Sequence, residues 1–123
     1  MNDEVGNKDL KARLRSYSLR IITLYNAMPQ KGAGAILGKQ MLRSATSVGA
    51  HYREAFRARS PAEFISKLEG GLQELDETDY WLDLLSGAEV IPAARLVGLI
   101  AETNELIAIF TTSVKTAKAN LKK

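Results

Sequence analysis

Apolar residues recur along the chain at steps of three and four, which is the spacing of one face of an α-helix packed in a bundle. Residues 9–28 form the first such segment, with the repeating positions Leu10, Leu14, Tyr17, Ile21, Leu24 and Met28. Residues 35–57 form the second, with Leu42, Ala45, Val48, Gly49, Tyr52 and Phe56. Between them, residues 29–34 carry one proline and two glycines, which are typical of a turn. The pattern therefore predicts two amphipathic helices joined by a short turn.

The second half of the chain predicts two more helices. Ser60, Pro61 and Glu63 occupy the positions of an N-cap, a first-turn proline and a capping-box acid. They predict the start of a helix over residues 61–85, with core positions Phe64, Leu68, Leu72, Leu75, Leu82 and Leu85. The last segment, residues 92–119, starts at a proline and has its apolar positions at Leu96, Ile100, Thr103, Ile107, Phe110, Val114 and Ala117.

Four helices of similar length joined by short turns favour an all-α, antiparallel up-and-down four-helix bundle. The length of 123 residues is that of one domain, so we expect a single bundle over residues 1–123. Within the third helix, Gly70 and Gly71 cost about 1 kcal/mol each relative to alanine. They predict a tight crossing against the backbone of another helix.

Composition excludes several kinds of protein. The sequence has no cysteine and one histidine, so neither a disulfide framework nor a thiolate metal site is available. Residues 1–8 are polar and lack the apolar stretch of a signal peptide. The apolar run at residues 106–114 is about half of the roughly 18 residues that a membrane span requires. We therefore expect a cytoplasmic protein without membrane contact.

No constellation of catalytic residues is apparent in the sequence. Asp76, Asp79 and Asp83 follow helical spacing but lack an accompanying nucleophile or phosphate loop, so a solvated face is the simpler interpretation. His51 and Glu54 share a helix face, but one histidine does not reproduce the duplicated Glu-x-x-His motif of metal-binding bundles. We expect no enzymatic activity, no metal and no cofactor.

Charge is distributed unevenly, although the formal net charge is only +3. From residue 8 to residue 67, twelve Lys and Arg residues accompany three acidic residues. Residues 68–94 contain seven acidic residues and no basic residue, namely Glu69, Glu74, Asp76, Glu77, Asp79, Asp83 and Glu89. Such segregation is associated with anionic partners or with self-association.

The second helix concentrates the basic charge. At 100° per residue, one stripe away from the apolar face contains Lys39, Arg43, Arg53 and Arg57, and Arg59 extends it beyond the helix. Such a ridge can bind the phosphates of RNA or DNA whatever the base sequence, although it can also be a solvated face. Alternatively, these arginines meet the carboxylates of the third helix in another subunit or protein, which would make the chain an assembly scaffold or adaptor.

Tyr80 and Trp81 are candidates for an oligomer interface. Because adjacent positions point to different sides of a helix, one of the two rings is expected to face outward. An exposed aromatic ring is typical of an interface anchor. The alternative is that both rings are partly buried in the bundle.

The segment from Ser47 to Phe64, with Leu68 and Glu74-Leu75 after it, resembles the signature of a bacterial family known as four helix bundle proteins. Some members are encoded in intervening sequences of the 23S rRNA gene. The family motif commonly runs small-Asn-Ile-Ala-Glu-Gly before a Ser-x-x-Glu-Phe capping box. The positions that match are Glu54, Ser60, Glu63 and Phe64, and those that depart are His51, Arg53 and Ala55.

This resemblance implies a bundle over about residues 9–120 that assembles into a ring-shaped homo-oligomer, a pentamer. A relative is the accessory protein of diversity-generating retroelements, which contacts nucleic acid and a reverse transcriptase. The resemblance therefore implies a non-catalytic protein associated with itself and with nucleic acid, in which the matching motif residues have structural roles.

Overall fold

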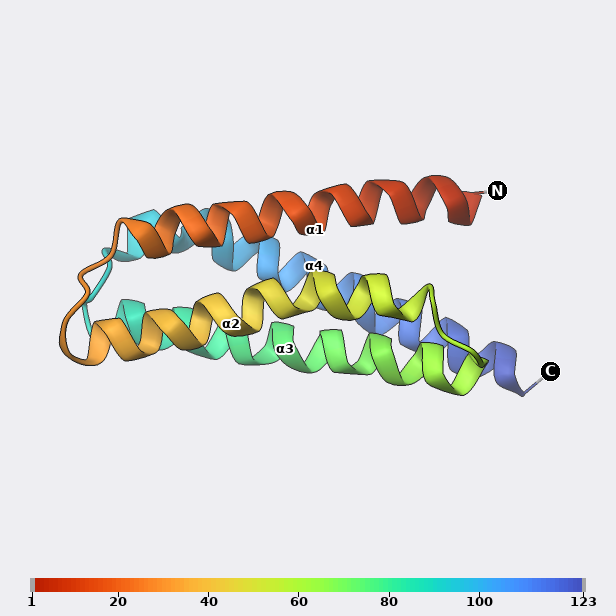
Figure 1. Cartoon of the computed structure of the whole chain (residues 1–123). Helices are drawn as coiled ribbons and strands as arrows, with labels where there is room; N and C mark the ends of the chain where they lie inside the picture. The colour runs from red at the N-terminus through yellow and green to blue at the C-terminus, as the bar shows by residue number, and fades with distance from the viewer. Residues whose placement is uncertain (1, 123) are drawn as a thin grey trace.

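The computed structural model describes the backbone of residues 2–122 and the side chains of residues 9–122. It contains four helices, α1 (Asn2–Asn26), α2 (Gly32–Ala55), α3 (Pro61–Gly87) and α4 (Ala93–Leu121). They alternate in direction, so both ends of the chain lie at the same end of the molecule (Figure 1). The described residues include no strand, and the predicted all-α fold of four helices is confirmed.

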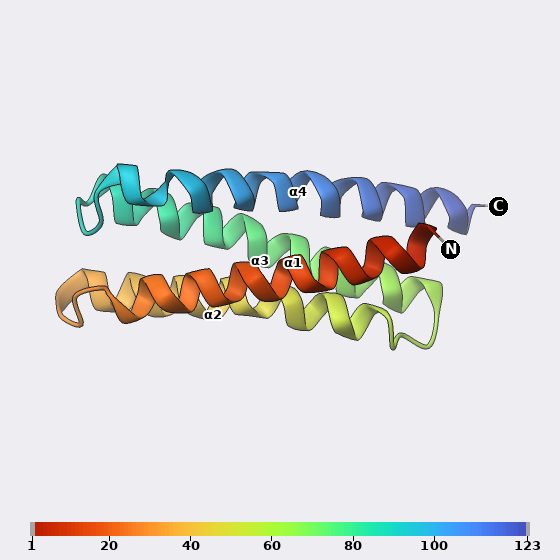
Figure 2. The ribbon, with the colours of Figure 1, turned by 90° about the horizontal axis from the view of Figure 1, so that it is seen from above.

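The four helices do not pack equally closely. α2 and α3 have the most extensive contact, followed by α3 with α4 and α1 with α2, while α1 and α4 have the least. Figure 2 shows α1 lying over α2 with α4 alongside. Figures 1 and 2 show that α1 and α4 cross at an angle, since they overlap at one end of the bundle in one view and at the opposite end in the other. The seam between α1 and α4 is therefore the most open.

The core follows the predicted helical faces. The buried apolar side chains of α1 are the predicted Leu14, Tyr17, Ile21 and Leu24, and the predicted Met28 is buried just after the helix. Other buried positions, among them Met41, Leu99 and Leu106, lie beside the predicted stripes because a helix packed against two neighbours buries a wider face than one seam. Phe56 was expected in the core but is 47% exposed, because α2 ends at Ala55 and Phe56 lies in the following turn.

Glycines account for two departures from the sequence-based prediction. α2 starts at Gly32, which has φ +60°, so Gly34 lies inside the helix and not in the turn. A Cβ atom at Gly34 would lie 2.9 Å from Val90 Cγ1, which explains the need for glycine there. Gly70 and Gly71 accommodate side-chain rings and not another backbone. Their added Cβ atoms would lie 2.9 Å from the His51 ring and 2.6 Å from Phe110 Cε2, respectively.

Two hydrogen bonds between hydroxyl groups connect helices inside the core. The Tyr17 and Thr103 hydroxyls, on α1 and α4, are 2.6 Å apart. The Ser44 and Thr78 hydroxyls, on α2 and α3, are 2.7 Å apart. Burial raises the pKa of Tyr17 to about 12, so this phenol stays protonated at neutral pH. No helix in the described part of the chain has the length and hydropathy needed to cross a membrane.

Candidate nucleic-acid interface

A groove of about 360 Å³ runs between α1 and α2 and gathers basic side chains from both helices. Lys11 and Arg15 line it from α1, and Arg53 lines it from α2. All three residues are exposed. None of the described residues that line this groove is acidic. Arg53 comes from the sequence-predicted ridge, whereas Lys11 and Arg15 were not predicted.

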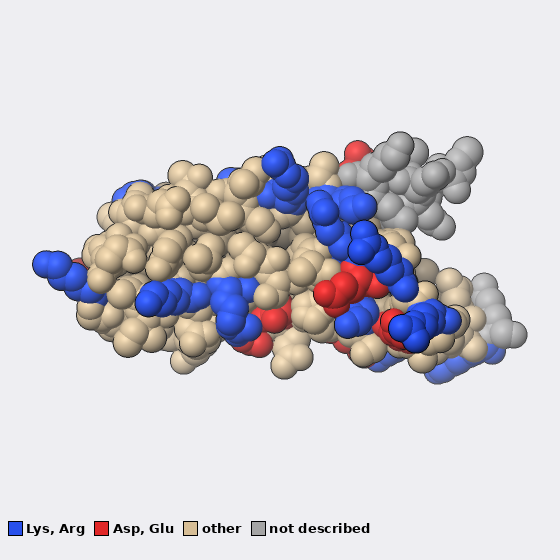
Figure 3. Space-filling view, viewed as in Figure 1, with Lys and Arg blue, Asp and Glu red and all other residues tan. Residues whose placement is uncertain are grey.

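The same basic concentration is visible on the molecular surface. On the face drawn in Figure 3, Lys and Arg side chains gather over the middle of α1 and the C-terminal half of α2, with acidic side chains among those over α2. Cations held at fixed positions in one groove produce a positive potential that attracts a phosphate chain. We name this surface the basic groove and define it by Lys11, Arg15 and Arg53.

The basic residues predicted on one stripe of α2 have different neighbours. Arg43 lies beside α3, with its guanidinium nitrogens 3.2 Å from Glu77 Oε1 and 3.7 Å from Glu74 Oε2. These carboxylates neutralise Arg43, so its charge is offset within the chain. The other members of the predicted set, Lys39, Arg57 and Arg59, are exposed. Arg53 therefore lies beside basic residues of α1, whereas Arg43 lies beside carboxylates of α3.

The residues that match the family motif have structural contacts. Lys67 Nζ donates a hydrogen bond to Glu54 Oε1 at 2.9 Å, so Glu54 pairs with α3 and not with the arginines that follow it in sequence. This pairing lowers the pKa of the Glu54 carboxyl and raises that of Lys67. The backbone N–H of Glu63 donates to Ser60 Oγ at 3.1 Å, which is the predicted N-cap. Phe64 is half-buried against the core.

Tyr80 and Trp81 occupy different environments, although their ring centroids are 5.3 Å apart. Tyr80 is 56% exposed, whereas Trp81 is half-buried and packs against the core. Trp81 Nε1 is buried and has no hydrogen-bond partner among the described residues. Tyr80 is therefore the ring that is available to a partner.

The acidic residues of α3 have different surroundings. Burial, together with the negative charges of Asp83 and Asp76, raises the pKa of Asp79. His51 Nε2 lies 3.9 Å from Glu74 Oε2, on the side of α2 that faces α3. Within the described residues, no three histidine or carboxylate side chains converge on a position that could hold a metal ion.

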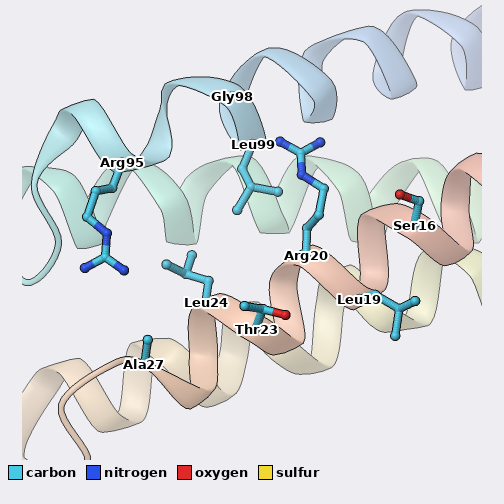
Figure 4. Close-up of a pocket in the computed structure, with 9 residues that line it drawn as sticks. All are labelled: Ser16, Leu19, Arg20, Thr23, Leu24, Ala27, Arg95, Gly98 and Leu99. Atoms are coloured by element: carbon cyan, nitrogen blue, oxygen red, sulfur yellow. The ribbon is translucent and has the colours of Figure 1, made fainter.

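A second groove, of about 450 Å³, lies on the open seam between α1 and α4. Figure 4 shows Leu24 and Leu99 extending toward each other across it, with Arg20 and Arg95 on either side of Leu99. Leu19, at the edge of this groove, is 44% exposed. The seam therefore leaves apolar surface accessible in the single chain.

The fold and these surfaces define a small four-helix protein with a basic groove between its first two helices and an open apolar seam between its first and last. The chain belongs to the 23S rRNA-intervening sequence protein family, whose model matches residues 8–112. The predicted family membership is confirmed.

One solved structure is similar over nearly the whole length. It is a protein of unknown function from the S23 ribosomal protein family of Bacteroides thetaiotaomicron, 34% identical to this chain with a TM-score of 0.82. The match covers 89% of this chain and 97% of that one. No curated protein matches the sequence significantly.

Proposed function

We propose that this chain is a non-catalytic, homo-oligomeric cytoplasmic protein that binds the phosphates of RNA or DNA in the basic groove. The supporting observation is that Lys11, Arg15 and Arg53 converge from two helices on a groove whose described lining contains no acidic side chain. Phosphate chains release counterions when such cations neutralise them, which provides affinity without base specificity. The Ser18 hydroxyl in the same groove can donate a hydrogen bond to a phosphate oxygen.

The proposed assembly is a ring of identical subunits, a pentamer by resemblance to the family. Accessible apolar surface supports self-association, since the exposed Leu19 borders the open seam, and the exposed Tyr80 and the half-buried Ile100 line a hollow between α3 and α4. Closed rings arise when two different faces of one subunit meet in a repeated contact. A ring would also repeat the basic groove, so several grooves could engage one nucleic acid and increase its overall affinity.

Single charge reversals test the role of the basic groove. Arg53→Glu is expected to abolish binding of a labelled mixed RNA and DNA pool at low salt, with the oligomer mass unchanged in light-scattering-coupled size exclusion. Lys31→Glu is the matched control, because it changes the net charge equally at the opposite end of α2. Equal binding by both variants would contradict the proposed site.

A second candidate function is a protein–protein scaffold, and the cluster of Asp76, Asp79 and Asp83 on α3 favours it. Asp76, Asp79 and Asp83 repel one another, so a basic surface on another subunit or protein would stabilise their ionised forms. The double variant Arg53→Glu with Arg57→Glu distinguishes the two functions. Loss of nucleic-acid binding by an intact oligomer supports the first function, whereas dissociation of the oligomer supports the scaffold.

A further inference from the structure

A pocket of about 330 Å³ opens at the end of the bundle where the turn between α2 and α3 meets the C-terminal half of α4. Its aromatic wall consists of Tyr52, Phe56 and Phe64. The rings form a continuous series, with centroids 4.9 Å apart for Tyr52 and Phe56 and 5.4 Å apart for Phe56 and Phe64. Phe56 is 47% exposed, so an aromatic face remains accessible at the mouth.

The opposite wall of this pocket is polar. Thr112, Thr116 and Asn120 line it from α4, and all three are exposed. Hydroxyl and amide groups provide both donors and acceptors of hydrogen bonds. An aromatic wall facing such groups suits a flat ring with polar edges, which stacks on one side and forms hydrogen bonds at its rim. Its volume is close to the lower limit of about 300 Å³ for ligand pockets, which favours a small occupant.

The pocket adjoins the basic groove. Tyr52 lines both concavities, and the next residue, Arg53, lies in the groove. Arg57 and Arg59 are exposed in the turn that follows Phe56. A chain of phosphates held in the groove would therefore reach the mouth of the pocket and meet further positive charge there. This continuity favours a nucleotide over an apolar peptide side chain, because an apolar side chain carries no negative charge to interact with the surrounding cations.

We propose that the pocket receives one unpaired base of a single-stranded nucleic acid, which stacks on Phe56 while its phosphates follow the basic groove. This inference rests on the proposed nucleic-acid binding and deepens it, because it makes a single strand with free bases the preferred partner over a duplex. Aromatic stacking is tolerant of base identity, so no sequence preference is required.

The test compares strands that differ only in their bases. The probes are labelled oligo(dT) and oligo(U) of about twelve nucleotides, within the range of single-strand binding sites, and abasic strands of equal length in each sugar. The wild-type protein is expected to bind the strand with bases about 5- to 150-fold more tightly than the abasic strand, in at least one sugar. Fluorescence anisotropy at low salt provides the dissociation constants.

Variants at Phe56 assign the effect to the pocket. Phe56→Ala is expected to remove the preference for bases while its affinity for the abasic strand stays unchanged, which also shows that the variant is folded. Phe56→Tyr keeps a ring and is expected to retain the preference. Ile36→Ala is the matched control, since it truncates an exposed apolar side chain near the start of α2, away from the pocket.

Negative results distinguish a failure of the stacking pocket from a failure of the proposed nucleic-acid binding. Equal affinity of the wild-type protein for strands with and without bases would overturn the stacking pocket and leave the proposed phosphate binding intact. The same holds if Phe56→Ala keeps the full preference for bases. Failure to bind any of the four strands would overturn the proposed function, and the pocket assignment with it.

Discussion

The Arg13 guanidinium on α1 forms a two-pronged ion pair with the Glu102 carboxylate on α4, with both nitrogen–oxygen distances at 2.7 Å. The two residues are 89 positions apart in sequence. The pair joins the two neighbouring helices with the least mutual contact, close to the hydrogen bond between Tyr17 and Thr103. Arg13 lowers the pKa of the Glu102 carboxyl, and that carboxylate in turn raises the pKa of Arg13.

The first prediction concerns the contribution of this ion pair to stability. Glu102→Gln is expected to lower the free energy of unfolding at neutral pH by about 1 to 3 kcal/mol, because a half-buried, charge-assisted pair is lost. Because the pKa of Glu102 is lowered in the folded state, its contribution is present above the ordinary value near 4.5 and is lost as pH falls through the folded value.

Urea unfolding between pH 6 and pH 3 at fixed ionic strength measures this effect. The wild type is expected to lose more stability across that range than Glu102→Gln. Glu105→Gln is the control, since Glu105 also lies 3.1 Å from Arg13 but is 67% exposed and is expected to contribute less than about 1 kcal/mol. If Glu102→Gln and Glu105→Gln lower the free energy of unfolding equally, the pair between Arg13 and Glu102 is not the stabilising one.

The second prediction concerns Asp79. Burial and two neighbouring carboxylates raise its pKa, so its ionised form destabilises the folded chain above that pKa. Asp79→Asn is expected to increase stability at pH 7 by about 0.4 to 1 kcal/mol, since it removes like-charge pairs with Asp76 and Asp83. The gain should shrink as pH falls and Asp79 becomes protonated. Thermal unfolding at pH 7 and at acidic pH measures the gain in stability. A loss of stability at pH 7 would contradict the prediction.

The third prediction concerns the contact between Gly71 and Phe110. An alanine Cβ at position 71 would lie 2.6 Å from the buried Phe110 ring, so the ring must move in a closely packed core. Gly71→Ala is expected to destabilise the bundle by about 1 to 3 kcal/mol despite the better helix propensity of alanine. At Gly49 the nearest atom, Leu14 Cβ, would be 3.8 Å away, so Gly49→Ala is expected to be neutral or stabilising by up to about 1 kcal/mol.

The fourth prediction compares two arginines of α2. Arg53 lines the basic groove, whereas Arg43 is neutralised by Glu74 and Glu77. Arg53→Ala is expected to weaken binding of a labelled single strand and to reduce the slope of log affinity against log salt by about 1. Arg43→Ala is expected to change that slope much less. Titrations at several salt concentrations measure both slopes, and equal effects of the two substitutions would remove the distinction between groove and ridge.

Local signals in the sequence predicted the helices and most of the core. The apolar period identified the buried face of α1, and Ser60 with Glu63 marked the start of α3 at the position where the structure has it. Both signals depend on interactions within a few residues along the chain, which is why they can be recognised without the rest of the fold. The prediction for Phe56 was wrong because the apolar pattern continues past Ala55, the last residue of α2.

The grouping of charges was decided by the tertiary structure. The sequence placed Arg43 and Arg53 in one basic stripe, but α3 neutralises the first, whereas the second joins Lys11 and Arg15 across the groove. Lys11 and Arg15 have the spacing of one helical face. This spacing could have identified them as groove residues only if the position of α2 had been known. Periodicity fixes the direction of a side chain around its own helix, whereas the rotation and register of neighbouring helices decide which side chains meet.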